Sequence, residues 1–265
     1  MNKVNVAILR AAGCNCDVEA AFAFELAGAD ARLIHINQLL SGDAQLDAFQ
    51  ILAIPGGFTY GDDVSAGKIL ANELKYQLTE QLYQFYEAGK LILGICNGFQ
   101  VLVKSGLLPQ ANLTASEPEA TLTYNDSGKY EDRWVYMKIN PASSCLFIQN
   151  MPEVIYIPVA HSEGKFVPRD DEVLAQLQRN NQVVFQYCDQ NGNEVEYPGN
   201  PNGSIAAIAG ICDPSGRILG LMPHPERYIH PTHHPRWTRE GLDKDAYGRY
   251  IFENAVNYMK IVSKN

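Results

Sequence analysis

The residue whose setting most suggests chemistry is Cys96, which lies between two glycines at the end of an apolar run. The run Leu91–Ile95 is rich in branched aliphatic residues and predicts a strand buried on both faces, as in a parallel sheet. Residues 99–105 then suit a helix. A nucleophile on a sharp strand-to-helix turn is the geometry of a nucleophile elbow, here with cysteine in place of serine. A Cβ on Gly94 or Gly98 would collide with neighbouring backbone in such a turn.

Cys96 would lie at the N-terminus of that helix, where the helix dipole and the free N–H groups favour a thiolate over a thiol. The alternative is a buried and inert cysteine after a strand, which is common in proteins. The two flanking glycines favour the first interpretation, and we therefore predict that Cys96 is a nucleophile.

A thiolate nucleophile needs a base, and the base needs a group that orients it. Of the six histidines, His224 is the strongest candidate, because the apolar run Ile218–Met222 brings it to the end of a predicted strand. Prolines on both sides restrict its backbone, and Glu226 is close enough in sequence to hold the second ring nitrogen. The sequence therefore predicts a triad of Cys96, His224 and Glu226.

The other histidines have weaker claims. His161 ends another predicted strand and is the second candidate for the base, although a place in the pocket lining suits it better. His35 lies within a predicted strand and is interpreted as structural. His230, His233 and His234 share a Pro-rich loop that could bind a metal, but such loops are more often polar surface or a partner contact.

The cysteines predict no metal site and no disulfides. The six cysteines lack the dense spacing of a secreted disulfide framework, so we expect reduced thiols. Cys14 and Cys16 are too close in sequence for an ordinary structural zinc pair, and no second pair completes four ligands.

Length and charge exclude several classes of protein. The chain has 265 residues, 46% of them hydrophobic, and no shift in composition marks a linker, so we expect a single domain over residues 1–265. The net charge of −9 and the scattered basic residues argue against nucleic acid or a membrane as a partner. No run approaches the roughly 18 apolar residues of a membrane span, and the first residues do not resemble a signal peptide, so we expect a cytoplasmic protein.

The segments before the predicted nucleophile alternate between strands and helices. The predicted strands are Val4–Leu9, Ala31–Ile36, Phe49–Ile54 and Leu91–Ile95. A helix capped by Asp17 would place Val18, Phe22 and Leu26 on one face, and a second helix would cover Val64–Ala88. A strand, a helix and a strand within about 35 residues form a βαβ unit, which predicts a parallel sheet.

Beyond Pro109 the sequence predicts antiparallel structure. Short β-branched or aromatic runs separated by turn residues predict strands over Ala120–Tyr124, Trp134–Ile139, Ile155–Val159 and Val183–Cys188. Ser204–Cys212 and Arg217–Met222 predict a β-hairpin, and the helix predicted over Asp245–Val262 would bury Ile251, Phe252, Ala255 and Met259. The predicted fold class is α/β, with a mostly parallel open sheet, helices on both faces and an antiparallel extension.

A Gly-rich loop, Pro55–Asp63, follows the third predicted strand, where open α/β folds place binding backbone. It lacks the Lys-Ser/Thr ending of a P-loop and the GxGxxG spacing, so it is a poor nucleotide site. The paired glycines suit N–H groups directed at a carbonyl oxygen, and a plain turn is the alternative.

Together these strings resemble class I, triad-type glutamine amidotransferases, whose fold is flavodoxin-like. The strings are Pro55–Asp62, Gly94–Gln100, Asn200–Ser204 with Ile208–Gly210, and Gly220–Arg227. They are most similar to the glutaminase subunits of phosphoribosylformylglycinamidine synthase, and the resemblance runs from Val4 to about Arg227. Two features depart from that family: Ala12 and Cys14 stand where Pro and Thr are usual, and the segment Tyr228–Gly241 is longer.

The resemblance implies a mechanism and partners. Cys96 would attack the side-chain amide of glutamine, and the backbone N–H groups of Gly57 and Asn97 would hold the oxyanion. Further substrate-binding positions would be Gly56, Phe58, Gln100 and His161. The ammonia would pass to a large synthetase subunit, assisted by a small accessory subunit, for the ATP-dependent conversion of formylglycinamide ribonucleotide to formylglycinamidine ribonucleotide in purine biosynthesis. This chain would need no cofactor, because ATP and Mg²⁺ belong to the synthetase.

Other functions remain open from the sequence. A stress protein of the same fold typically carries His directly after the elbow cysteine, where this chain has Asn97. A γ-glutamyl hydrolase resembles the chain less well around His224 and Glu226. A catalytically silent binding subunit is the alternative from another class, and the complete set of triad residues argues against it.

Overall fold

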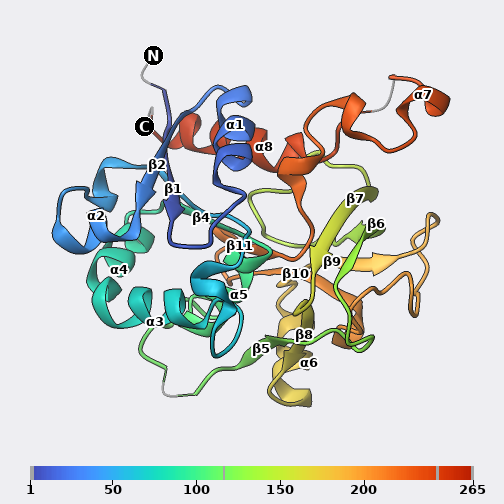
Figure 1. The fold of residues 1–265 in the computed structure, drawn as a ribbon, viewed down its shortest axis with the longest axis horizontal. Coiled ribbons are helices and arrows are strands. Elements are labelled where there is room, and N and C mark those ends of the chain that lie inside the picture. Colours follow the sequence, from blue (N-terminus) through green and yellow to red (C-terminus); the bar gives the residue numbers. More distant parts are fainter. Residues whose placement is uncertain (1–2, 116, 243–244, 264–265) are drawn as a thin grey trace.

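The computed structural model describes residues 3–115, 117–242 and 245–263, and in them a nine-stranded sheet forms the centre of the molecule (Figure 1). The order in the sheet is β2-β1-β3-β4-β11-β10-β9-β6-β7. Its strands are β1 Asn5–Arg10, β2 Asp30–His35, β3 Ile51–Ile54, β4 Leu91–Ile95, β6 Glu131–Ile139, β7 Val154–His161, β9 Val183–Cys188, β10 Ile208–Cys212 and β11 Ile218–Leu221. Pairing is parallel from β2 to β11 and antiparallel from β11 to β7. The predicted fold class is confirmed.

Helices cover both faces of the parallel strands (Figure 1). The α-helices of the described residues are α1 Asp17–Leu26, α2 Ile36–Ser41, α3 Lys68–Gln77, α4 Thr79–Glu87, α5 Asn97–Ser105, α6 Asp171–Arg179, α7 Trp237–Glu240 and α8 Arg249–Val262, of which α6 and α7 lie away from the parallel strands. Helix α1 contacts α8 on one face, and α3 contacts α5 on the other. A small sheet of β5 Ala120–Thr123 and β8 Lys165–Pro168 lies beside α5. In the described residues no helix has both the length and the apolar character needed to span a membrane.

The turn from β4 to α5 has the tight geometry that the sequence predicts. Every residue of β4 is buried, and Cys96 follows it with a φ of 51° and a ψ of −105°. A Cβ on Gly98 would lie 1.8 Å from the carbonyl oxygen of Ile54, and one on Gly94 would lie 2.7 Å from the carbonyl oxygen of Gly98. Only glycine fits either position, because α5 starts directly against the end of β3 at Gly98, and its first turn and Leu102 lie directly against Gly94.

The prediction for α1 is wrong about its buried face. Val18, Phe22 and Leu26 are 65%, 52% and 51% exposed. The helix instead buries its alanines and Phe24, whose ring meets that of Phe252 in α8 at 4.9 Å between centroids. Small side chains let α1 lie close to the sheet, so the large apolar residues at helical spacing are left on the outside.

The start of α1 also differs from the prediction. Asp17 is the first helical residue and makes no capping hydrogen bond, since Cys16 occupies the cap position. The Asp17 carboxylate instead pairs with Arg10 at 2.5 Å, which joins the start of α1 to the end of β1.

The single helix predicted over Val64–Ala88 is two helices. Val64 and Gly67 have φ values of 71° and 72°, so regular helix starts only at Lys68. Leu78, with a φ of −119°, separates α3 from α4. The Thr79 hydroxyl donates to the carbonyl of Lys75, and this kind of side-chain bond to the preceding turn bends helices.

In the second half the prediction missed β8, α6 and α7 and placed the start of β10 too early. Helix α6 was not predicted, although Asp170 caps it by accepting from the N–H of Val173, and Val173 and Leu177 bury one face. The strand predicted from Ser204 begins at Ile208, because Ala206 adopts a left-handed φ of 51°.

The crowding at the β4–α5 turn predicts the effect of a single methyl group. Gly98→Ala should lower the free energy of unfolding by about 2–4 kcal/mol, because the new Cβ must displace the backbone of β3. Urea denaturation measures this loss. Gly128→Ala is the control: its φ of 65° disfavours alanine, but no atom lies within 4 Å of the added Cβ, so it should cost at most about 1–2 kcal/mol. Equal losses would contradict the account of the turn.

Candidate active site

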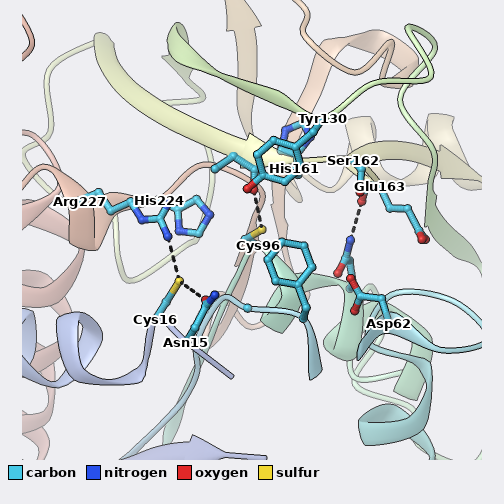
Figure 2. Close-up of a pocket in the computed structure, with 14 residues that line it drawn as sticks. Asn15, Cys16, Asp62, Cys96, Tyr130, His161, Ser162, Glu163, His224 and Arg227 are labelled. Carbon is cyan, nitrogen blue, oxygen red and sulfur yellow. Dashed lines mark hydrogen bonds between the residues drawn. The ribbon is translucent and has the colours of Figure 1, made fainter. Parts of the chain in front are cut away.

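A cavity of about 70 Å³ opens beside Cys96 (Figure 2). It is lined by Asn15, Cys16, Gly57, Phe58, Asp62, Cys96, Gln100, Tyr130, Ala160, His161, Ser162, Glu163, His224 and Arg227. Most of the residues predicted for the site from the sequence are in this set. The three others, Gly56, Asn97 and Glu226, lie directly behind the wall, in contact with Cys96 or His224 or adjacent to Cys96 in the chain. The structure therefore gathers all the predicted positions in one place.

Cys96 is held at the floor of this cavity by the turn described above. Its side chain is 6% exposed, and its Sγ lies 3.7 Å from the carbonyl oxygen of Ala160 at the end of β7. Asn97 is the first residue of α5, so its backbone N–H has no acceptor within the helix and is free for a ligand. A thiol and a free N–H group thus lie side by side at a helix N-terminus.

His224 and Glu226 form a buried pair beside the thiol. The Nδ1 atom of His224 lies 2.6 Å from Oε1 of Glu226, and the backbone N–H of His224 donates to Pro158 at 2.9 Å. Burial alone lowers the pKa of His224, but the Glu226 carboxylate and the neighbouring Cys96 raise it well above its usual range. Within the described chain Nε2 has no hydrogen-bond partner, and the ring faces Cys96 (Figure 2).

The Gly-rich loop after β3 is fixed against both the first loop and α5. The N–H of Phe58 donates to Gly13 at 3.0 Å, while the hydroxyl and N–H of Thr59 donate to Oδ1 of Asn97 at 2.7 and 3.3 Å. Gly57 has a φ of 146°, and a Cβ there would lie 2.8 Å from the backbone nitrogen of Asn15. The loop is therefore not a plain turn, because it places the backbone of Gly57 in the cavity wall next to Asn97.

His161 lies in the cavity wall as a neutral ring. It is 3% exposed, and its Nδ1 atom lies 3.1 Å from Oδ1 of Asn125. Burial, and secondly the charge of His224, lower the pKa of His161 to about 3. A neutral imidazole that stays neutral cannot shuttle protons near pH 7, so the geometry favours His224 as the base.

Sequence reasoning did not assign a site role to several residues of the cavity. Cys16 and Asp62 belong to sequence strings that resemble those of the glutamine amidotransferases, and this resemblance could have marked them as candidate site residues. Tyr130 comes from the loop between β5 and β6, and Glu163 comes from the turn after β7. Neither has a local pattern that marks it, because only the fold brings these loops to Cys96.

One cluster among the described residues has donor atoms close enough to hold a metal ion: atoms of Cys16, Glu19, His224 and Glu226 lie within 4.8 Å of one another. The guanidinium group of Arg227 already binds two of these residues, Cys16 and Glu19. Arg227 donates from Nη2 to Sγ of Cys16 and from Nε to Glu19, both at 3.1 Å. Since Glu226 also holds Nδ1 of His224, we assign no metal to this cluster.

The histidine loop lies apart from the cavity. His230 and His233 have ring centroids 6.1 Å apart, and the ring of His234 meets that of Trp134 at 5.4 Å. None of the three lines the cavity around Cys96.

A cysteine on a strand-to-helix turn, faced by a histidine–carboxylate pair, is the arrangement of enzymes that form covalent thioester intermediates. The sequence pattern of the CobB/CobQ-like glutamine amidotransferase domain matches residues 3–259, and the chain belongs to this family.

Named relatives match the chain over almost its full length. It is 49% identical to phosphoribosylformylglycinamidine synthase subunit PurQ of Dehalococcoides mccartyi, with 99% of this chain and 100% of that one covered. It is 42% identical to the subunit PurQ of Methanococcus maripaludis, with 96% of each chain covered. Among solved structures, a chain of PurLQS from Thermotoga maritima matches with a TM-score of 0.73 at 30% identity, covering 97% of this chain and 99% of that one.

The neutral state of His161 predicts a pH dependence of stability. Below pH 6.5 the unfolded chain protonates this ring, while the folded chain does not until about pH 3. The unfolding free energy should therefore fall by about 2 kcal/mol between pH 6.5 and pH 5 from this residue alone. Urea denaturation of the wild type and of His161→Gln at both pH values isolates the contribution. Identical pH dependence in the two proteins would contradict it.

The surroundings of the thiols predict which one reacts first with iodoacetamide. Burial raises the pKa of Cys14 to about 12, that of Cys188 to about 11, and also that of Cys16 and Cys145. A hydrogen bond with Cys145 lowers the pKa of Cys212, but that thiol is fully buried. Cys96 faces a cavity, a helix N-terminus and a protonated His224, so it should be alkylated first at neutral pH. Peptide mass spectrometry after sub-stoichiometric labelling checks this. Earlier labelling of Cys145 or Cys188 would disprove the elbow assignment.

Proposed function

We propose that this chain is the glutaminase subunit of phosphoribosylformylglycinamidine synthase, which releases ammonia from glutamine for a synthetase subunit in purine biosynthesis. The observation that carries the proposal is the full-length similarity to subunits of that name, at 49% identity for the D. mccartyi protein. The buried pair of His224 and Glu226 beside Cys96 supports it, because the residues required for glutamine hydrolysis are all present.

In the first half of the proposed reaction, the thiolate of Cys96 attacks the side-chain amide carbon of glutamine. The carbonyl oxygen becomes an oxyanion next to the N–H groups of Gly57 and Asn97, and each such donor is worth about 3 kcal/mol in comparable enzymes. His224, whose raised pKa keeps it protonated, gives a proton to the departing nitrogen. The carbon–nitrogen bond breaks, ammonia leaves, and a γ-glutamyl thioester remains on Cys96.

In the second half, His224 is neutral and accepts a proton from water, which attacks the thioester. Glutamate leaves, the thiolate of Cys96 is restored beside the protonated His224, and the site returns to its first state. Glu226 orients the ring through Nδ1 in both halves, so that Nε2 always faces the reacting atoms. Because His161 stays neutral, it contributes shape and polarity to the cavity and takes no proton.

The fate of the ammonia implies partners. In water at pH 7 the ammonia would be mostly protonated and would lose its nucleophilicity. It must therefore reach a second active site without contact with bulk water. We propose a large synthetase subunit, which holds ATP and Mg²⁺, and a small accessory subunit. The similarity to a chain of the PurLQS structure from T. maritima supports an assembly of this kind.

Reconstitution with the candidate synthetase and accessory subunits tests the proposal. In the complex, Cys96→Ser should lower glutamine-supported formation of the amidine product by at least about 10³-fold and leave ammonia-supported formation unchanged. Cys188→Ser, a change at a buried thiol outside the cavity, serves as the control and should preserve both rates. Equal loss of both rates in Cys96→Ser, or glutamine use that needs no Cys96, would refute the proposal.

A further inference from the structure

A second thiol lies beside the reacting thiol, and the proposed glutaminase reaction does not use it. Of the six cysteines, all of which lie in the described residues, only Cys16 and Cys96 line the cavity. Cys16 is the cap residue of α1 and is 1% exposed. Figure 2 shows both sulfurs beside the ring of His224. The proposed base therefore has two thiols as neighbours.

Gly56 leaves a small space that both cysteines border. A Cβ on this residue would lie 3.1 Å from Sγ of Cys16, 3.5 Å from Cβ of Cys96 and 2.8 Å from Cε1 of His224. Because glycine has no side chain, nothing of residue 56 fills the space between the Cys16 sulfur and the side chain of Cys96. The two cysteines therefore lie across a gap that is too small for a methyl group.

The Cys16 sulfur is held by contacts that a side-chain rotation can release. It donates to Oδ1 of Asn15 at 3.3 Å and accepts from Nη2 of Arg227 at 3.1 Å. Thiols are weak donors and weak acceptors, and the guanidinium group keeps a second partner, Oε1 of Glu19, at 3.1 Å. Cys16 can therefore turn towards Cys96 without leaving the arginine unpaired.

Cys14 lies two residues earlier, but its thiol is directed elsewhere. Its sulfur lies 3.9 Å from the carbonyl oxygen of Leu9 and 3.7 Å from that of Gly56, and Cys14 does not line the cavity. It has the same chemistry as Cys16 and nearly the same place in the sequence, without access to Cys96. Cys14 is therefore a matched control for Cys16.

The two cavity thiols differ in protonation. Cys96 faces a helix N-terminus and the protonated His224, which favour the thiolate, and the thiolate is the form that peroxides oxidise. Burial raises the pKa of Cys16, although His224 and Arg227 act in the opposite direction, so Cys16 keeps its proton near pH 7. Cys96 is therefore the thiol that is oxidised first, and Cys16 is the neighbour that can react with the product.

We propose that Cys16 is a resolving thiol, which forms a reversible disulfide with Cys96 when the site meets hydrogen peroxide. This inference rests on the proposed function only for its consequence, a reversible stop of glutamine hydrolysis. The disulfide occupies the nucleophile and protects it from further oxidation to the sulfinic acid, which thiols do not reduce.

The oxidation proceeds in two steps. The Cys96 thiolate attacks one peroxide oxygen, the oxygen–oxygen bond breaks, and the hydroxide that leaves takes the proton of His224 to form water. The Cys16 sulfur then attacks the sulfur of the Cys96 sulfenic acid, and the sulfur–oxygen bond breaks. The hydroxide that leaves takes the Cys16 proton. One hydrogen peroxide is thus reduced to two waters while each sulfur loses one electron.

Peptide mapping of the oxidised full chain tests the bond itself. The chain is treated with hydrogen peroxide, the peroxide is removed with catalase, free thiols are blocked with N-ethylmaleimide, and tryptic peptides are analysed without reduction. The wild type should give peptide 11–32 linked to peptide 91–104, and fragmentation should place the link at Cys16. Cys14→Ser should give the same link. A link at Cys14, a bond between Cys14 and Cys16, or no link would overturn the proposal.

Recovery of activity tests what the disulfide does. Chain that has lost most of its glutamine-supported rate to peroxide is assembled with untreated partner subunits, with and without dithiothreitol, and is compared with the same protein before oxidation. With dithiothreitol, wild type and Cys14→Ser should regain at least about 80% of that rate, while Cys16→Ser should regain less than about 20%, because its sulfenic acid continues to the sulfinic acid. Equal recovery in Cys16→Ser and the wild type would contradict the role of Cys16.

The outcomes separate the two proposals. If Cys16→Ser has no rate to recover, the linked peptide in the wild type and in Cys14→Ser decides, because it is detected without turnover. A wild-type complex that forms the amidine product from ammonia but never from glutamine would overturn the proposed function. The peptide map would still decide whether Cys16 and Cys96 form a disulfide.

Discussion

The structure of the site depends on one steric constraint, the contact between the start of α5 and the end of β3. With no side chain on Gly98, the backbone of α5 passes so close to Ile54 that a Cβ would lie 1.8 Å from the carbonyl oxygen. This closeness forces Cys96 into a left-handed conformation and raises its sulfur out of the turn into the cavity. Any larger residue at position 98 would push α5 away and take the nucleophile with it.

The side chain of Asn97 connects the two halves of the site. Its oxygen accepts from Thr59, which ties the loop that carries Gly57 to the start of α5. Its nitrogen donates to both Asp62 and Gln100. One buried amide therefore sets the distance between the backbone groups near the reacting carbon and the acidic end of the cavity. A shift of the Gly-rich loop would move Gly57 and Asp62 together, so the two ends of the cavity are mechanically coupled.

The parts of the site that the sequence predicts are those coded by neighbouring residues. Two glycines around Cys96 indicate the turn, and Glu226 follows His224 so closely that their contact needs only local chain geometry. The face of α1 could not be predicted in the same way, because the preference for burying alanines over Phe22 depends on how near the sheet and α8 approach. Spacing shows which residues share a face but not which face is covered.

Tyr130 was beyond prediction for a related reason, and although Asp62 belongs to a string that resembles the family, its place in the cavity could not be predicted. The position of Asp62 depends on left-handed residues that follow a glycine-rich segment, and propensities do not specify such a loop. Tyr130 reaches the cavity from a loop of the antiparallel extension, more than thirty residues after Cys96, and only the packing of that extension on the parallel strands brings it there.

The central claim is that the sulfur at this turn becomes acylated by glutamine under the control of His224. Mass spectrometry of the complex quenched in acid during glutamine turnover, followed by peptide mapping, tests it most directly. The account predicts a γ-glutamyl adduct on the peptide that contains Cys96 in the wild-type complex, and no such adduct in the complex of Cys96→Ser. Glutamate formation with no adduct on Cys96, or with an adduct on another cysteine, would contradict it.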